Sequence, residues 1–110
     1  MSDLSRKRCE PCASGTPALS SERVRELLKE LRGWDLSPDS KRISRKFGFK
    51  NFHETMAFVN ALAWVAHRED HHPDLEVSYK TCGVTYWTHT VDGLSENDFI
   101  CAAKLDALVA

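Results

Sequence analysis

The histidines of this chain are concentrated in one region. Four of the five, His67, His71, His72 and His89, fall between positions 67 and 89. Imidazole is the side chain whose unperturbed pKa lies nearest neutral pH, so this concentration predicts proton transfer or metal binding. His71 and His72 are adjacent and precede Pro73, while His89 comes one predicted hairpin later. Either chemistry requires elements that bring these rings together.

The segment before the histidines predicts a helix and a hairpin. Ser20 or Ser21 caps a helix whose apolar residues recur with helical spacing, and Gly33 closes it. Two extended pieces follow, 34–36 and 41–49, on either side of a Pro-Asp turn.

The second predicted helix carries the histidine pair at its end. A capping box at Asn51 begins it. Pro73 forces His72 out of helical geometry, so the helix must end near Asp70 or His71. Its apolar side carries Phe52, Met56, Val59, Ala63 and Ala66, and Leu62 and Trp64 widen this apolar surface.

A second hairpin follows the histidine pair. Residues 75–80 alternate between apolar and polar types, which predicts a half-buried strand with Tyr79 on its core face. After a turn near 81–83, residues 84–90 form the next strand, which places Trp87 and His89 on the face that no helix covers.

The elements together define the fold class. Ser95 caps a final helix, so the chain order is α-β-β-α-β-β-α. Two hairpins with helices between them predict an α+β fold, in which three helices cover one face of a four-stranded antiparallel sheet. The folded domain is expected over residues 20–110. Residues 1–19 have a composition that packs poorly and are expected to form a flexible N-terminal arm.

Composition narrows the possible partners and the compartment. A net charge of −1 argues against direct nucleic acid binding. No apolar run has the length of a membrane span, and no secretory signal is recognisable, so a cytoplasmic protein is expected. Cys9 and Cys12 have the spacing of a zinc or redox pair, but no second such pair accompanies them. A reduced, disordered arm, metal or redox chemistry, and a disulfide all remain open.

The spacing His71-His72-Pro73, then Tyr79, His89 and Asp98, resembles the signature of the pterin-4a-carbinolamine dehydratases. The similarity runs from about residue 20 to residue 108. It implies dehydration of 4a-hydroxytetrahydrobiopterin to quinonoid dihydrobiopterin, which recycles the pterin after aromatic amino acid hydroxylation. It also implies no metal or other cofactor, a homodimer or homotetramer, and a functional link to an aromatic amino acid hydroxylase.

The resemblance assigns roles by position. His71 and His89 become the acid/base groups at C4a of the pterin, and His72 holds the pterin ring. Trp34 matches a pocket tryptophan, although a place in the core is equally open. His67 stands where relatives often have a glutamate, and Trp87 stands where a small polar residue is common.

Three further residues complete the candidate site as supports. Thr88 lies directly before His89. Asp70 either orients a histidine or ends a polar helix turn. Asp98 either supports the site or completes a capping box with Ser95.

Two other functions stay open. His67 and His71 share a helix face at ligand spacing, and His89 could complete a metal site. Alternatively, the chain is a non-catalytic or dual-role dimerisation partner of another protein, as some relatives are. An intact histidine trio favours the enzyme, because a pure scaffold has no need of it.

Overall fold

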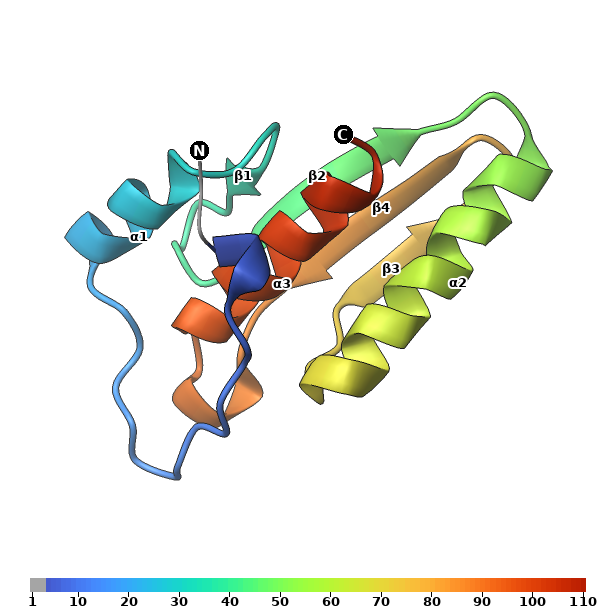
Figure 1. Cartoon of the computed structure of the whole chain (residues 1–110). Coiled ribbons are helices and arrows are strands. Elements are labelled where there is room, and N and C mark those ends of the chain that lie inside the picture. Colours follow the sequence, from blue (N-terminus) through green and yellow to red (C-terminus); the bar gives the residue numbers. More distant parts are fainter. Residues whose placement is uncertain (1–3) are drawn as a thin grey trace.

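The structure is a computed structural model that describes residues 4–110. Three α-helices and four β-strands alternate as the sequence predicts, so the predicted α+β fold class is confirmed. Two short 3-10 helices accompany them (Figure 1). The elements are η1 (Leu4–Arg6), α1 (Ser21–Leu28), β1 (Asp35–Leu36), β2 (Ile43–Gly48), α2 (Phe52–Glu69), β3 (Asp74–Val77), β4 (Thr81–Tyr86), η2 (His89–Val91) and α3 (Glu96–Leu108).

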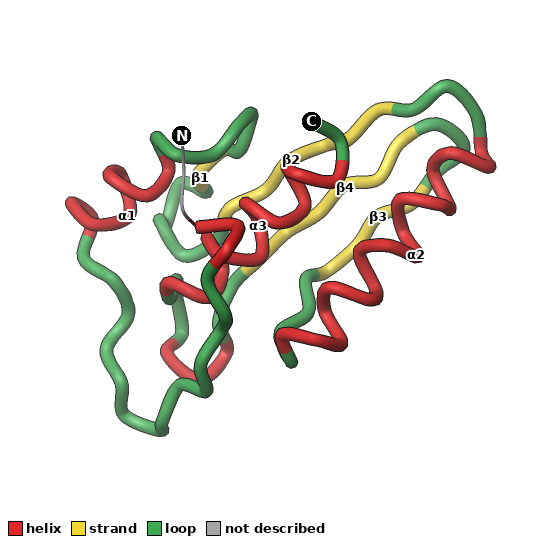
Figure 2. The backbone as a smooth tube through the Cα atoms, in the orientation of Figure 1, coloured by secondary structure: helices red, strands yellow, loops and turns green. Residues whose placement is uncertain are grey.

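The four strands form one antiparallel sheet in the order β1-β2-β4-β3. Figure 2 shows α2 and α3 on the same side of this sheet. Alternate residues of β4, Cys82, Val84 and Tyr86, are fully buried under the helices. Gly83 and Thr85 lie on the opposite face, as a period of two requires. The core therefore sits between the helices and one face of the sheet.

Helix caps set the boundaries of the first two helices. The Ser20 hydroxyl accepts a hydrogen bond from the Arg23 backbone N–H, and the Asn51 side chain accepts one from Glu54 N–H. Both predicted N-caps are confirmed. The first helix ends at Leu28, before the predicted Gly33. Turns fill the gap, and Gly33 adopts a left-handed φ of 75° there, which favours glycine.

Helix α2 buries part of the predicted apolar surface. Its buried residues are Thr55, Phe58, Leu62 and Glu69, and Val59 packs against the core. By contrast, Phe52 is 44% exposed, Ala63 is exposed and Trp64 is 61% exposed. The predicted surface was too wide because α2 carries apolar residues around more than one side, so periodicity alone does not select the side that meets the sheet.

The second hairpin is shifted relative to the prediction. The turn lies at 78–80, closed by a hydrogen bond from Ser78 N–H to Thr81 C=O, and β4 begins at Thr81. Strand β3 is the sheet edge and all of its residues are exposed. Tyr79 lies beyond β3, is 62% exposed and stacks on Phe52, so its predicted core position was wrong.

The N-terminal segment packs more closely than its composition suggests. Leu4 is buried in the core cluster. Lys104 Nζ donates to the Ser5 carbonyl at 2.8 Å, and Lys7 pairs with Glu96 at 2.8 Å. Figure 1 shows this segment, in blue, running beside α3. Residues 1–3 of the predicted arm lie outside the described residues, and the flexibility of the arm stays a prediction.

Within residues 4–110, no helix combines the length and the apolar character needed to cross a membrane.

Asp106 on α3 joins three parts of the chain. Its carboxylate accepts hydrogen bonds from the Trp34 indole N–H at 2.8 Å, from Arg45 Nη1 at 2.6 Å and from the Arg32 backbone N–H at 3.0 Å. Trp34 and Asp106 are buried, so these donors have little access to water.

We expect Asp106→Ala to lower the free energy of unfolding by about 2–3 kcal/mol, because it leaves a buried N–H and a guanidinium without their acceptor. Urea unfolding measures the change. Glu26→Ala, which removes a carboxylate of an exposed pair, is the control and should change stability by about 0.5 kcal/mol or less. Equal effects of the two variants would contradict this role of Asp106.

Candidate active site

His71 lies directly after α2 in a fixed orientation. Asp70 ends the helix in a left-handed conformation with φ of 51°. The next N–H, that of His71, still bonds to the Ala66 carbonyl at 3.2 Å. The imidazole Nε2 is 2.6 Å from Asp98 Oδ1, and the ring stacks on Tyr86 with centroids 5.7 Å apart. A hydrogen bond and an aromatic face thus hold the ring on two sides.

Asp98 is the fully buried partner of His71. Its other oxygen, Oδ2, accepts hydrogen bonds from the Thr88 hydroxyl at 2.8 Å and from the Ser95 backbone N–H at 3.0 Å. The capping box between Ser95 and Asp98 is present, so the predicted capping role is confirmed. The same carboxylate also binds His71, and one residue therefore makes both of the contacts that the sequence presents as alternatives.

His89 lies just past the end of β4. The predicted strand over 84–90 extends too far, because β4 ends at Tyr86 and His89 begins η2. The exposed His89 ring lies 4.2 Å from the Trp87 ring, and the Arg42 guanidinium covers Trp87 at 3.7 Å. A left-handed Asp92, with φ of 50°, ends η2. His71 thus follows one left-handed aspartate, Asp70, and the His89 segment ends at another, Asp92.

The other predicted site residues lie at different depths. His72 is exposed between α2 and β3. His67 is exposed and lies 5.5 Å from the Trp64 ring. Trp34 is in the core, which is the second of its two predicted places. Its ring centroid lies 6.0 Å from that of Tyr86, and Tyr86 in turn stacks on His71.

A hollow of about 350 Å³, hereafter the His71 hollow, opens beside this histidine. Asp70, His71 and Thr88 line it, together with Thr90 and the segment 9–12. The lining brings three predicted site residues together, whereas His72 and His89 lie outside it. Sequence reasoning missed the wall made by residues 9–12. The Cys9–Cys12 spacing marked that segment, but nothing in it indicated contact with His71.

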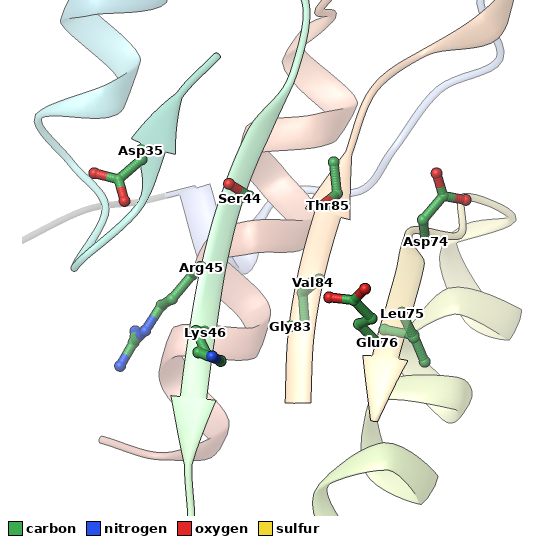
Figure 3. A pocket seen from close by; sticks show the side chains of 10 residues that line it. All are labelled: Asp35, Ser44, Arg45, Lys46, Asp74, Leu75, Glu76, Gly83, Val84 and Thr85. Atoms are coloured by element: carbon green, nitrogen blue, oxygen red, sulfur yellow. The ribbon is translucent and has the colours of Figure 1, made fainter. Parts of the chain in front are cut away.

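A second hollow, of about 490 Å³, lies on the open face of the sheet (Figure 3). Its lining comes from all four strands and includes the charged side chains of Asp35, Lys46, Asp74 and Glu76. No predicted site residue lines this second hollow, whereas Asp70, His71 and Thr88 line the first. The His71 hollow is therefore the candidate active site.

The described residues, 4–110, contain no group of three or more His, Cys, Asp or Glu side chains arranged to hold a metal ion. His67 and His71, the proposed helix pair of ligands, make separate contacts: the first with Trp64 and the second with Asp98.

Glu69 ties the N-terminal wall to α2. Its buried carboxylate accepts a hydrogen bond from the Cys9 backbone N–H at 2.8 Å and pairs with Arg8 at 3.2 Å. Burial alone raises the pKa of Glu69, but the Cys9 N–H and the Lys104 and Arg8 charges outweigh it and lower that pKa below its usual value. The carboxylate form thus stabilises the attached wall.

Comparison with known proteins agrees with this architecture. The family model for pterin 4 alpha carbinolamine dehydratase matches residues 17–108. The chain therefore belongs to the pterin-4-alpha-carbinolamine dehydratase family, and the resemblance seen in the sequence is confirmed. A Nitrosomonas europaea protein named "Putative pterin-4-alpha-carbinolamine dehydratase" is 58% identical over 96% of this chain and 93% of its own. A Legionella pneumophila protein of the same name is 55% identical over 98% and 96%.

Two solved structures share the fold. One, titled a transcriptional coactivator/pterin dehydratase from Brucella melitensis, has a TM-score of 0.81 and 32% identity, and covers 84% of this chain and 99% of its own. A pterin dehydratase-like protein described as a RuBisCO assembly factor has a TM-score of 0.63 over 72% of this chain and 92% of its own. At 24% identity it shows the fold alone.

We expect Glu69→Gln to destabilise the protein at neutral pH and to lose this effect in acid. A carboxylate with a lowered pKa stabilises the fold above its ordinary pKa of 4.5, and protonation removes that contribution as the pH falls. Urea unfolding at a series of pH values measures the difference between the two proteins. Glu26→Gln, at an exposed residue of α1, is the matched control. A difference that stays constant down to acid pH would contradict the role of the Glu69 charge.

Proposed function

We propose that this protein dehydrates a pterin-4a-carbinolamine to the quinonoid dihydropterin, with histidine side chains as the general acid and base. The observation that carries the proposal is His71, held by the buried carboxylate of Asp98 at the edge of a hollow. The hollow's volume of about 350 Å³ falls in the range of small-molecule sites, about 300–1,000 Å³. Membership of the dehydratase family supports the same reaction.

The reaction needs proton transfer more than any other form of catalysis. A carbinolamine carries a hydroxyl and an amine on one carbon, and the N5 lone pair expels the hydroxyl as a C=N bond forms. The departing oxygen must receive a proton, and a nitrogen proton must leave. A positioned histidine that exchanges protons near neutral pH typically contributes about 10²–10⁴-fold.

Asp98 fixes which nitrogen of His71 serves the substrate. When Nε2–H is donated to the carboxylate, Nδ1 is left to exchange the substrate proton, in the way that a buried aspartate orients the histidine of a catalytic triad. The stacked Tyr86 ring limits rotation of the imidazole. Asp70 and Thr88, at the rim of the hollow, are the supporting groups, and Thr88 orients Asp98.

His89 is the proposed second acid/base group, with His72 as a contact for the pterin ring. The Thr88 hydroxyl bonds to Asp98, so the residue before His89 is fixed to the partner of His71. The two histidine segments therefore share one buried anchor. The reaction would proceed without a metal or cofactor, in the cytoplasm. It would act on the 4a-carbinolamine that an aromatic amino acid hydroxylase releases, and so recycle tetrahydropterin after hydroxylation.

Self-association is the second part of the proposal, as a homodimer or homotetramer. Helix α2 exposes Trp64 and Phe52, and the edge strand β3 exposes Leu75 and Val77 next to its unpaired side. Apolar side chains gathered on a helix and beside a sheet edge are typical of subunit contacts. The Brucella protein is described as a transcriptional coactivator/pterin dehydratase. If this chain also has two roles, the same face would contact its partner protein.

We expect His71→Ala and His89→Ala each to lower the dehydration rate at least tenfold, because each removes a group that transfers a proton faster than solvent does. Decay of the 4a-carbinolamine, followed with each variant, measures the rate. Circular dichroism checks that the variants fold.

His53→Ala is the matched control, because His53 is exposed in the first turn of α2, away from the hollow. Its rate should equal that of the unchanged protein. Full activity of both site variants would exclude the acid/base roles. Activity that disappears with a chelator and returns with zinc would instead favour the metal-dependent alternative.

We expect Trp64→Asp to reduce the assembly to smaller species in light scattering, because a charge placed on the apolar α2 face opposes its burial between subunits. Lys46→Asp, on the open sheet face, is the control and should leave the molar mass unchanged. A Trp64→Asp protein of unchanged molar mass would exclude α2 as the contact.

A further inference from the structure

Two cysteine thiols meet beneath the N-terminal segment. Cys9 Sγ lies 3.5 Å from Cys101 Sγ, although the residues are 92 positions apart in sequence. Two hydrogen bonds hold the neighbouring backbone in place: Cys9 N–H donates to Glu69, and Glu10 N–H donates to the Asn97 side chain at 3.1 Å. The contact is therefore part of an anchored segment rather than a chance approach of two side chains.

The two thiols differ in what can reach them. Cys9 is half-buried and lines the His71 hollow, while Cys101 is fully buried in α3. The contact with Cys9, followed by burial, raises the pKa of Cys101. A reagent that enters from solvent therefore reaches the Cys9 thiol first, and the Cys101 thiol lies behind it.

A third buried group adjoins the pair. Tyr86 is fully buried, and its hydroxyl lies against the Cys101 thiol. Burial, followed by the Cys101 and Cys9 sulfurs, raises its pKa. The phenol ring also stacks on His71. The thiol pair is therefore separated from the histidine by a single side chain.

We propose that Cys9 and Cys101 form a reversible disulfide that fastens the N-terminal wall of the His71 hollow under oxidising conditions. The oxidant is a low-molecular-weight disulfide. Cys9 thiolate attacks one of its sulfurs, which forms a mixed disulfide and releases the first thiol. Cys101 then loses its proton and attacks Cys9 Sγ, which forms the protein disulfide and releases the second thiol. The protein loses two electrons and two protons, and the oxidant gains them.

Geometry favours Cys101 over Cys12 as the second partner. The Cys9 and Cys101 sulfurs are already in contact at 3.5 Å, and a disulfide brings them to about 2.05 Å. Cys12 has a different neighbour, the Asn97 amide, whose nitrogen lies 3.7 Å from its sulfur. That same amide donates to the Glu10 carbonyl at 2.6 Å and so holds the loop between Cys9 and Cys12.

The bond would act on the hollow because of where it lies. Residues 9–12 form one wall, which hydrogen bonds, an ion pair and the packing of Cys9 against the core attach to the rest of the domain. A disulfide from Cys9 to α3 would add a covalent link to these non-covalent contacts. Transient disulfides in reducing compartments are usually of this redox-sensing or catalytic kind.

Oxidised glutathione tests the proposal on the full chain. After incubation, free thiols are alkylated in denaturant, and chymotrypsin, which cleaves after Tyr86, Trp87 and Phe99, separates Cys82 from Cys101. The Cys12→Ser variant should lose two of its three thiols and yield a peptide pair that joins Cys9 to Cys101. Dithiothreitol should restore all three thiols. The cross-linked form should also unfold at a higher temperature, because the bond closes a long loop.

Cys9→Ser and Cys101→Ser are the matched variants that remove the pair from either side. Cys9→Ser changes a half-buried residue and keeps the fold testable if the core substitution unfolds the protein. Neither variant should form a disulfide with Cys82, because Cys82 is fully buried on β4. Two results would overturn the proposal: a Cys9–Cys12 disulfide with Cys101 left reduced, or a Cys12→Ser protein that stops at the Cys9 glutathione adduct. Neither depends on pterin turnover.

Discussion

The buried carboxylate of Asp98 is the interaction on which the rest of the site depends. An unpaired carboxylate without contact with water is costly, so its surroundings must supply donors. Three different segments supply them: His71 after α2, Thr88 after β4 and Ser95 before α3. Satisfying one acid thus fixes the mutual positions of the segments that carry the chemistry. Residues far apart in sequence are held together because each of them forms a hydrogen bond with the same carboxylate.

The N-terminal segment changes what the site consists of. The family match begins at residue 17, yet residues 9–12 line the same hollow as His71. The Nitrosomonas and Legionella relatives align over 96% and 98% of this chain, so their similarity takes in nearly all of that segment. A site built from the domain alone would be open on one side. Glu69 and Asn97 close it by binding backbone groups of the segment.

Local sequence signals predicted where helices and strands lie better than they predicted which side chains are buried or in contact. Caps such as Ser20 and Asn51 act within one turn, so reading them requires no knowledge of the tertiary fold. Tyr79 shows the limit, because alternation along a strand cannot reveal that the strand lies at the sheet edge. Leu4 was missed because a single apolar residue in a polar segment makes no periodic pattern. For Asp98 the capping box was visible, whereas its contact with His71 depends on tertiary packing.

The three tryptophans occupy three distinct environments, and this offers an optical view of the site. Trp34 is enclosed by the core, Trp64 faces water, and Trp87 lies between the Arg42 guanidinium and the His89 ring. Of the three indoles, Trp87 is the one in contact with His89, so a pterin that binds beside that histidine would change the emission of Trp87 first.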